Sequence, residues 1–322
     1  MTLLDVNHLA VSYKTRDGVL HAVRDVSFSL NRGESLGIIG ESGCGKTTIG
    51  MSILGLLPEN AGIRAGSILF NGTDLAGLSD LRMQEIRGAK ISMIFQAAMN
   101  SLNPVHRVAD QITEAIRVHE PSLTEKEAAS RVETLFDEVG LSRERIRDFP
   151  HQYSGGMKQR AIIAMALACS PELIIADEPT TALDMVVQNQ ILSKIKAVQN
   201  DKGIAVLLIS HDMGVISEVC HDVAVVFKGE MLEYGTCRKI LDSPQHPYTR
   251  KLISSCIKLS HQAVMPDFKE ETEVAAAGPV AGNACVFCAN CPNADSLCRK
   301  GRPDFSKVSD GHRVRCHMFS DV

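Results

Sequence analysis

One segment constrains this chain more than any other: GESGCGKT at residues 40–47, which fits the pattern G-x-x-x-x-G-K-[ST]. A short apolar strand is predicted before it, at 35–40, and a helix that we expect to reach about Leu57 follows it. Glycines let successive backbone N–H groups point at phosphate oxygens, and the helix N-terminus adds partial positive charge. The Lys46 ammonium can reach the β- and γ-phosphates, and the Thr47 hydroxyl can bind Mg²⁺. The segment therefore predicts a strand–loop–helix unit that binds a nucleoside triphosphate.

A second segment, LIIADEP at 173–179, ends a predicted buried strand with two adjacent carboxylates. Such a pair is repulsive without a cation, so it suits a site beside Mg²⁺ and ATP. Asp177 is then expected to hold the magnesium shell and Glu178 to polarise an attacking water. Taken alone, the pair could be a solvated acidic strand end; the phosphate loop favours the magnesium site.

The remaining pattern predicts an α/β fold. Residues 1–33 alternate apolar and polar, as in antiparallel strands with a turn near Asp17-Gly18, and residues 66–75 read as a hairpin with an Asn71-Gly72 turn. Strand patterns separated by helices imply a parallel core; they lie at 90–95, 172–177, 205–210 and 222–227. A charged block at 105–145, with a helix cap expected at Thr124, indicates a helical insertion.

Composition excludes several classes of protein. The 322 residues are 44% hydrophobic and 22% charged, with a formal net charge of −4, as in ordinary globular proteins. A large nucleic-acid footprint would normally appear as a basic excess. No apolar run approaches the ~18–20 residues of a membrane span. The first residues include Asp5 and no basic opening segment, so we expect no secretory signal.

Cysteines gather near the C-terminal end, after an acidic and Ala/Gly-rich stretch at 269–283 that we expect to be a linker. Five of the ten cysteines belong to this group: Cys285, Cys288, Cys291, Cys298 and Cys316. In a reducing compartment, clustered thiols suggest a metal or iron–sulfur site before disulfides.

A third segment, SGGMKQR at 154–160, lies between the phosphate loop and the acidic strand end. Alone it reads as a helix N-cap with flexible residues. In this order and spacing it resembles the signature motif of ATP-binding cassette (ABC) ATPases, and the resemblance covers roughly residues 4–256. It implies a P-loop ABC ATPase core with an antiparallel β subdomain and a helical subdomain, and hydrolysis by a dimer.

The resemblance assigns roles by position. It implies that Tyr13 stacks on adenine, that Gln96 senses Mg²⁺ and the membrane partner, and that His211 lies near the γ-phosphate. The implied catalytic residues are Glu178, His211, Lys46 and Gln96, and the implied magnesium ligands are Thr47, Gln96 and Asp177. The implied ATP-binding residues are Tyr13, Gly40, Glu41, Ser42, Gly43, Cys44, Gly45, Lys46, Thr47, Thr48, Gln96 and Asp177, joined by Ser154, Gly155, Gly156 and Asp184 of a second subunit.

Each of these positions also has a plainer interpretation when taken alone. Tyr13 could be a core or edge-strand aromatic, and Gln96 a polar strand end. Asp184 and the His211-Asp212 pair could be local helix caps. Their joint occurrence in family order makes the set specific.

Several segments resemble one branch of the family, the ATPase subunits of oligopeptide, dipeptide and nickel importers. They are IFQAAMNSLNP (94–104), FPHQYSGGMKQR (149–160), ADEPTTALD (176–184), ISHDMGV (209–215) and SPQHPYTRKL (243–252). Two positions depart from that branch: Ala97-Ala98 replaces an acidic residue followed by proline, and Tyr153 replaces a common leucine.

The tail resembles this branch too, in which some members hold a [4Fe–4S] cluster. The resemblance implies Cys285, Cys291, Cys298 and Cys316 as ligands, with Cys288 spare. Four thiolates on a short looped chain also suit zinc, and unliganded thiols are the third alternative.

These observations predict an ABC ATPase domain at 1–256, with a helical subdomain at about 97–160, and a C-terminal extension at 257–322. The expected function is ATP hydrolysis that powers a binding-protein-dependent importer of di- or oligopeptides. An importer of nickel or another small solute, and a soluble non-transport ATPase, are the alternatives. The expected partners are two permeases, a second ATPase (identical or paralogous) and, indirectly, an extracytoplasmic binding protein, with no nucleic acid. We expect a peripheral location on the cytoplasmic face of the inner (plasma) membrane.

Overall fold

The computed structural model describes residues 2–96, 101–181, 183–257 and 283–319. The strands of this part of the chain join in a twelve-stranded sheet with the order β5-β4-β1-β2-β10-β9-β3-β8-β7-β6, and β12 pairs with both β10 and β11. The strands are β1 (Thr2–Thr15), β2 (Gly18–Asn31), β3 (Ser35–Ile39), β4 (Ala61–Phe70), β5 (Thr73–Asp74), β6 (Ile91–Ile94), β7 (Leu173–Asp177), β8 (Ala205–Ser210), β9 (Asp222–Phe227), β10 (Glu230–Thr236), β11 (Phe305–Ser309) and β12 (His312–Arg315).

The N-terminal strands form the expected antiparallel layer. Strands β1 and β2 pair from Thr15↔Gly18 onward, and Gly18 has a φ of 126°, which a residue with a side chain rarely adopts. The hairpin predicted around Asn71-Gly72 is present as β4–β5, with Phe70 opposite Thr73. Both predicted hairpins are therefore confirmed.

The central strands β6, β7, β8, β3 and β9 are parallel neighbours, as predicted. Consecutive side chains of a strand point to opposite faces, so one strand serves two cores. Leu207 belongs to the core shared with the antiparallel strands, and Leu208 to the core shared with the helical region and the tail. Burial on both faces explains the nearly continuous apolar runs of these strands.

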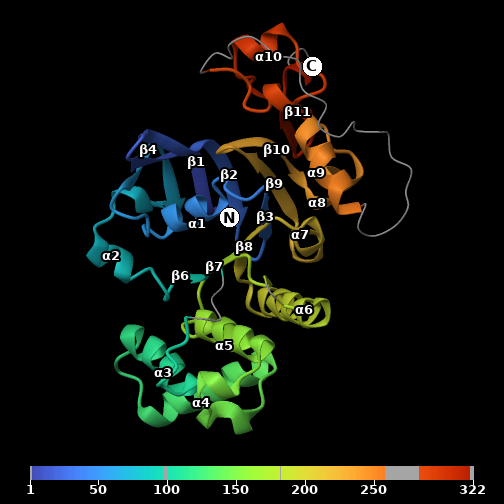
Figure 1. Ribbon diagram of the computed structural model, residues 1–322. Helices are drawn as coiled ribbons and strands as arrows, with labels where there is room; N and C mark the ends of the chain where they lie inside the picture. The colour runs from blue at the N-terminus through green and yellow to red at the C-terminus, as the bar shows by residue number, and fades with distance from the viewer. Residues whose placement is uncertain (1, 97–100, 182, 258–282, 320–322) are drawn as a thin grey trace.

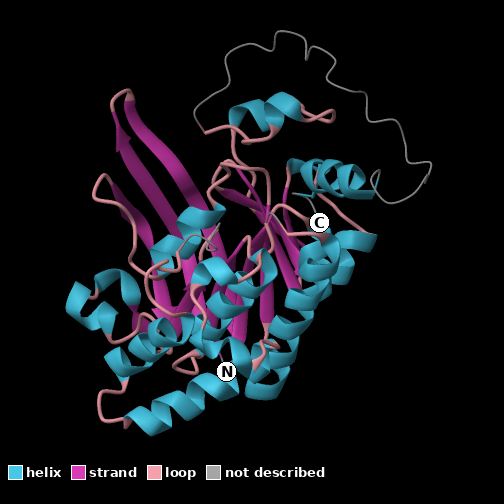
Figure 2. Cartoon of the chain, turned by 60° about the horizontal axis from the view of Figure 1, so that its bottom comes forward, coloured by secondary structure: helices cyan, strands magenta, loops and turns pink. Residues whose placement is uncertain are grey.

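Helices surround the parallel strands, whereas the long antiparallel strands extend beyond them (Figure 2). The α-helices are α1 (Lys46–Ile53), α2 (Asp80–Gln84), α3 (Val108–His119), α4 (Glu125–Val139), α5 (Gly155–Leu167), α6 (Met185–Lys202), α7 (Met213–Val219), α8 (Cys237–Asp242), α9 (Pro247–Ile257) and α10 (Ser296–Lys300). Short 3₁₀ helices lie at Leu75–Gly77, Arg143–Arg147, Pro150–Gln152, Cys288–Asn290 and His317–Phe319.

Helix α1 is shorter than expected. It ends at Ile53 rather than near Leu57, because Leu54 is its C-cap and Gly55 follows with a φ of 60°. A glycine in the left-handed region is a common helix terminator.

Helices α3, α4 and α5 form a separate lobe beside the sheet (Figure 1). The predicted cap at Thr124 is a capping box: its hydroxyl accepts from the Glu127 N–H, and the Glu127 carboxylate accepts from the Thr124 N–H. The segment at 143–147, expected to be helical, is a 3₁₀ helix.

The cysteine-rich tail docks on β10. Strand β12 pairs with it antiparallel, with Val314 opposite Glu233. Arg315 is buried and donates to Asp25 Oδ2 on β2 over 2.7 Å, and Arg302 donates to the same oxygen over 2.8 Å. Two guanidinium–carboxylate contacts, of which the Arg315 one is buried, thus attach the tail to the cassette.

Two features of the sequence lie outside the described residues: the linker at 269–283, apart from its last residue, and the Ala97-Ala98 pair. Among the residues described, none of the helices is both long and apolar enough to cross a membrane.

Candidate active site

The carboxyl ends of four parallel strands carry the residues expected to bind and hydrolyse ATP. Since parallel strands end at one edge of a sheet, residues far apart in sequence meet there. The phosphate loop follows β3, Gln96 lies just after β6, the Asp177–Glu178 pair ends β7, and His211 follows β8.

The phosphate loop folds back on itself at glycines. Gly45 has a φ of 105°, and a Cβ on Gly40 would lie 2.1 Å from the Val226 carbonyl oxygen. Only glycine allows this approach to β9. The buried Lys46 ammonium donates to the carbonyl oxygens of Gly40 (2.8 Å) and Glu41 (2.9 Å), so it lies inside the loop.

Asp177 is the residue whose surroundings most suggest a cation. Its side chain is 1% exposed, and neither carboxylate oxygen has a hydrogen-bond partner of good geometry. Burial raises the pKa of Asp177; the nearby Thr47 hydroxyl and Lys46 ammonium act against the rise, and Glu178 adds to it. An unpaired buried carboxylate beside a phosphate loop is the arrangement that Mg²⁺ satisfies. These residues fit a magnesium ion.

Glu178 lies at the centre of a polar cluster. Its Oε1 accepts a hydrogen bond from His211 Nδ1 over 2.8 Å. Its Oε2 accepts from the Thr181 hydroxyl (3.0 Å) and from Gln96 Nε2 (3.3 Å). Glu178 and His211, which we expect to handle the attacking water, therefore lie together with Gln96, which we expect to sense Mg²⁺.

The backbone and charge of Glu178 are both unusual. Its φ is 48°, in a region that costs a residue with a side chain about 1–3 kcal/mol and is concentrated at functional sites. Partial burial works to raise the pKa of Glu178, but the hydrogen bonds from His211 and Thr181 and the charge of Lys46 outweigh it. The net pKa is below the ordinary value. Glu178 is thus a carboxylate at neutral pH.

Tyr13, expected to face adenine, is on β1. Its hydroxyl lies 3.2 Å from the Thr48 hydroxyl, in the first turn of α1. The Tyr13 side chain is thus held against the helix that begins at the phosphate loop.

The residues expected to contact the nucleotide of a second subunit lie at the N-termini of two other helices, α5 and α6. Ser154 caps α5, accepting from the Met157 N–H, and Asp184 caps α6, accepting from the Val187 N–H. A Cβ on Gly156 would lie 2.7 Å from a Val187 methyl, so the two helix N-termini adjoin. Within the described residues, no hydrogen bond joins them to the phosphate loop.

Two residues at the site were not predicted. Thr181 donates to Glu178, and its signal was its position three residues after that glutamate. Tyr248 accepts a hydrogen bond from the Glu41 backbone N–H over 3.0 Å. It lies in the segment SPQHPYTRKL, which indicated only a branch of the family.

The tail cysteines are mutual neighbours. Cys285, Cys288, Cys298 and Cys316 are buried, and Cys291 is half-buried. Burial raises the pKa of Cys285 to about 11, with contributions from the thiols of Cys288, Cys316 and Cys291. Across the described residues, no group of three or more His, Cys, Asp or Glu side chains is arranged to hold a metal ion. The predicted cluster therefore stays a prediction.

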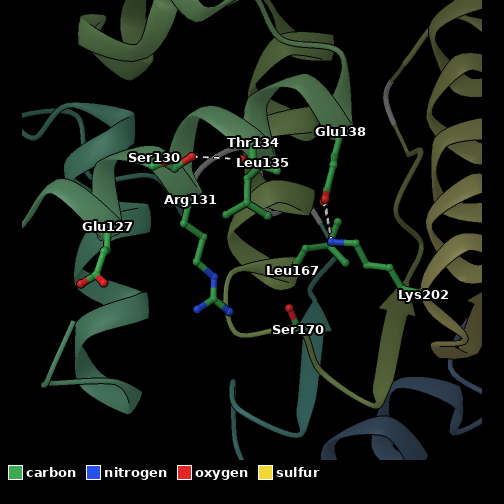
Figure 3. Close-up of a pocket in the computed structure, with 9 residues that line it drawn as sticks. All are labelled: Glu127, Ser130, Arg131, Thr134, Leu135, Glu138, Leu167, Ser170 and Lys202. Atoms are coloured by element: carbon green, nitrogen blue, oxygen red, sulfur yellow. Dashed lines mark hydrogen bonds and ion pairs between the residues drawn. The ribbon is translucent and has the colours of Figure 1, made fainter. Parts of the chain in front are cut away.

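The helical lobe has a separate depression of about 410 Å³ (Figure 3). At one side Lys202 and Glu138 form an ion pair of 2.7 Å. Its lining residues are Glu127, Ser130, Arg131, Thr134, Leu135, Glu138, Leu167, Ser170 and Lys202. None of them is a residue expected to bind nucleotide, so the depression is distinct from the phosphate site.

A phosphate loop facing acidic and histidine side chains at the carboxyl edge of a parallel sheet defines a P-loop nucleotide hydrolase. The model of the family "ABC transporter" matches residues 23–181, and that of "Oligopeptide/dipeptide transporter, C-terminal region" matches 232–298.

Curated relatives match nearly the whole chain. The dipeptide transport ATP-binding protein DppD of Bacillus subtilis is 45% identical, over 98% of this chain and 94% of its own length. OppD of the same organism, an oligopeptide transport ATP-binding protein, is 42% identical over 98% and 89%. DppD of Escherichia coli is 37% identical over 100% and 98%.

The chain is similar to the solved dimeric structure of MJ0796, a bacterial ABC transporter cassette, with a TM-score of 0.67 and 26% sequence identity. The match covers 73% of this chain and 99% of that chain. A second structure of that cassette, in a post-hydrolysis state with ADP and phosphate, gives 0.66. This chain belongs to the ATP-binding proteins of ABC transporters and is an ATPase.

Proposed function

We propose that this chain is the ATP-hydrolysing subunit of a binding-protein-dependent importer of di- or oligopeptides. One observation carries the proposal: an ATPase site lies in the same chain as a region, 232–298, that matches the oligopeptide/dipeptide transporter C-terminal model. The curated relatives are named as dipeptide or oligopeptide transport ATP-binding proteins.

The residues divide the chemistry between binding and activation. Thr47, Asp177 and Gln96 would hold Mg²⁺, and Tyr13 with the amides of residues 40–48 would hold ATP. Bound Mg²⁺ neutralises charge on the phosphates. Lys46 would turn from the Gly40 and Glu41 carbonyls to donate to phosphate oxygens. Glu178, ionised and fixed by His211 and Thr181, orients the attacking water and accepts its proton.

A second ATPase copy would complete the site. Ser154, Gly155, Gly156 and Asp184 lie at adjoining helix N-termini away from the phosphate loop of their own chain. Helix N-termini bind anions well, so these residues suit the γ-phosphate of a facing subunit. Similarity to a dimeric cassette supports this arrangement.

The remaining partners and the location follow from the same assignment. The chain would bind two permeases at the cytoplasmic face of the inner membrane, with the binding protein on the other side. We further propose an ATPase domain at 1–256, with a helical subdomain at about 97–160, and an extension at 257–322.

A tagged pull-down from solubilised membranes tests the assembly. The expected result is recovery of two multi-span permeases, with or without a second ATPase. Uptake of labelled dipeptides by cells that carry the wild-type chain, and not by cells with Lys46→Ala, would establish the substrate class. Uptake of nickel instead would favour the alternative solute. Recovery with nucleic acid or ribosomal proteins, and without permeases, would refute transport.

The predicted [4Fe–4S] cluster remains a proposal, and no step of ATP hydrolysis passes through it. Its support is the gathering of five thiols in one docked tail. The raised pKa values of Cys285 and Cys298 mean that binding a metal through these two thiols would release protons. Anaerobic purification should give a brown protein with iron and sulfide. Loss of both in Cys298→Ser, but not in Cys288→Ser, would support Cys285, Cys291, Cys298 and Cys316 as ligands; zinc alone, or no metal, would remove the cluster.

A further inference from the structure

Behind the phosphate loop, a tyrosine from the far end of the cassette contacts the loop backbone. Tyr248 is the second residue of α9 and lies 207 positions from Glu41 in sequence. Its hydroxyl oxygen accepts a hydrogen bond from the Glu41 backbone N–H over 3.0 Å. The side chain is 1% exposed, and burial raises its pKa, so it is a neutral phenol.

That hydrogen bond orients both polar groups of one peptide unit. The Glu41 N–H and the Gly40 carbonyl belong to the same planar peptide unit. The Gly40 oxygen accepts from Lys46 Nζ over 2.8 Å. Fixing the N–H side of this unit therefore also fixes the direction of the carbonyl that holds the phosphate-binding ammonium.

Tyr248 is held through its backbone as well as through its hydroxyl. Its backbone N–H donates to His246 Nδ1 over 3.0 Å, and burial lowers the pKa of His246 to about 3, so the ring is the neutral acceptor that this bond needs. The backbone N–H of His246 donates to Glu233 Oε2 over 2.9 Å. Glu233 Oε1 also accepts from His312 of the tail over 2.7 Å. The start of α9 is thereby joined to the tail.

The tail also contacts the tyrosine ring directly. Phe287, between Cys285 and Cys288 in sequence, is 2% exposed. Its ring centroid lies 5.5 Å from that of Tyr248 and 5.3 Å, edge-on, from that of Phe227. Phe227 ends β9, next to the Val226 carbonyl against which Gly40 packs. Such aromatic pairs contribute orientation as well as buried area.

We propose that Tyr248 is a positioning residue for the phosphate loop, and that the cysteine-rich tail sets its orientation through Phe287. The tail then controls nucleotide affinity without touching nucleotide. The inference rests on the ATPase assignment and goes beyond the transport proposal.

The test uses the full-length chain and MgATP. Tyr248→Phe keeps the ring and removes the hydroxyl; loss of one neutral hydrogen bond predicts an increase of about 3- to 10-fold in the Kd and KM for MgATP. The value of kcat at saturating ATP should stay within about twofold. The matched control is Tyr234→Phe, which removes a hydroxyl that donates to Asp222 over 2.9 Å, away from the loop; its Kd should be unchanged.

A second readout needs no activity. Hydrogen exchange of the peptide containing residues 40–47, measured without nucleotide, should be faster in Tyr248→Phe and unchanged in Tyr234→Phe.

Phe287→Leu keeps an apolar side chain and removes the ring; it should raise the Kd for MgATP about 2- to 5-fold alone and less than twofold in the Tyr248→Phe background.

A wild-type Kd and wild-type exchange in Tyr248→Phe would overturn the role of Tyr248. Additive effects of Phe287→Leu and Tyr248→Phe would overturn the link to the tail. Both outcomes are separable from failure of the transport proposal, which would leave MgATP binding by the wild-type chain intact.

Discussion

Replacing Glu178 by glutamine tests the proposed hydrolytic step most directly. The side chain keeps its shape and loses its charge and basicity. One carbonyl oxygen remains to accept from His211, and the new amide group can donate to the Thr181 hydroxyl, which now accepts. The folding cost is therefore about one neutral hydrogen bond, ~1 kcal/mol or less.

The catalytic cost is far larger. A positioned general base contributes about 10²–10⁴ to a rate, which corresponds to about 2.7–5.4 kcal/mol in the activation free energy. We expect kcat to fall by that factor in Glu178→Gln, with the Kd for MgATP within about threefold and a dimer that persists with bound ATP. Because the pKa of Glu178 lies below its ordinary value, the carboxylate is ionised throughout pH 6–8, so the loss should not vary over that range.

The assay is steady-state phosphate release, with nucleotide binding and size-exclusion chromatography in MgATP. Glu172→Gln is the matched control: Glu172 immediately precedes the same strand, β7, and contacts Arg32 and Asn71 away from the site. It should leave kcat unchanged. A Glu178→Gln protein with kcat within threefold of the wild type would refute the assignment of the base.

Two further predictions concern buried charge. Asp177→Asn should weaken Mg²⁺ binding at least tenfold while raising the Tm of the metal-free protein, because it removes an unpaired buried carboxylate. The pKa of Asp177 is raised in the folded state, so ionising this carboxyl destabilises the fold once the pH exceeds the pKa of Asp177 in the unfolded chain. The Tm advantage of Asp177→Asn should therefore grow from pH 4 upward. A constant difference in Tm would contradict this. Arg315→Ala should lower the free energy of unfolding by about 3 kcal/mol and expose the tail to limited proteolysis, because Asp25 and Glu230 lose a buried cation. Lys300→Ala, on the exposed surface of the same tail, should do neither, and an uncleaved tail in Arg315→Ala would refute its anchoring role.

Much of the fold was predictable because its signals are local. Alternation predicted the β1–β2 hairpin, the Asn71-Gly72 turn predicted the β4–β5 hairpin, and Thr124 predicted a helix start. The end of α1 was misplaced since apolar residues continue past Gly55, where the backbone turns. The site residues at strand ends were predictable as a set, because parallel topology brings strand ends to one edge.

The unpredicted contacts are those between distant segments. Asp25 meets Arg315 across 290 positions, and Glu41 meets Tyr248 across 207. No periodicity relates such pairs, since they depend on which strand the tail joins and where α9 begins. The positive φ of Glu178 is likewise set by its neighbours rather than by its own preference.

The sequence by itself determined a phosphate-binding strand–loop–helix unit and the acidic strand end that faces it, because each is encoded within a few consecutive residues. The tertiary structure alone decided how Glu178 is held between His211, Thr181 and Gln96, and how the tail packs behind the loop. Those arrangements arise only when sheet pairing brings separate segments together, so their energies belong to the folded chain and not to any local stretch of it.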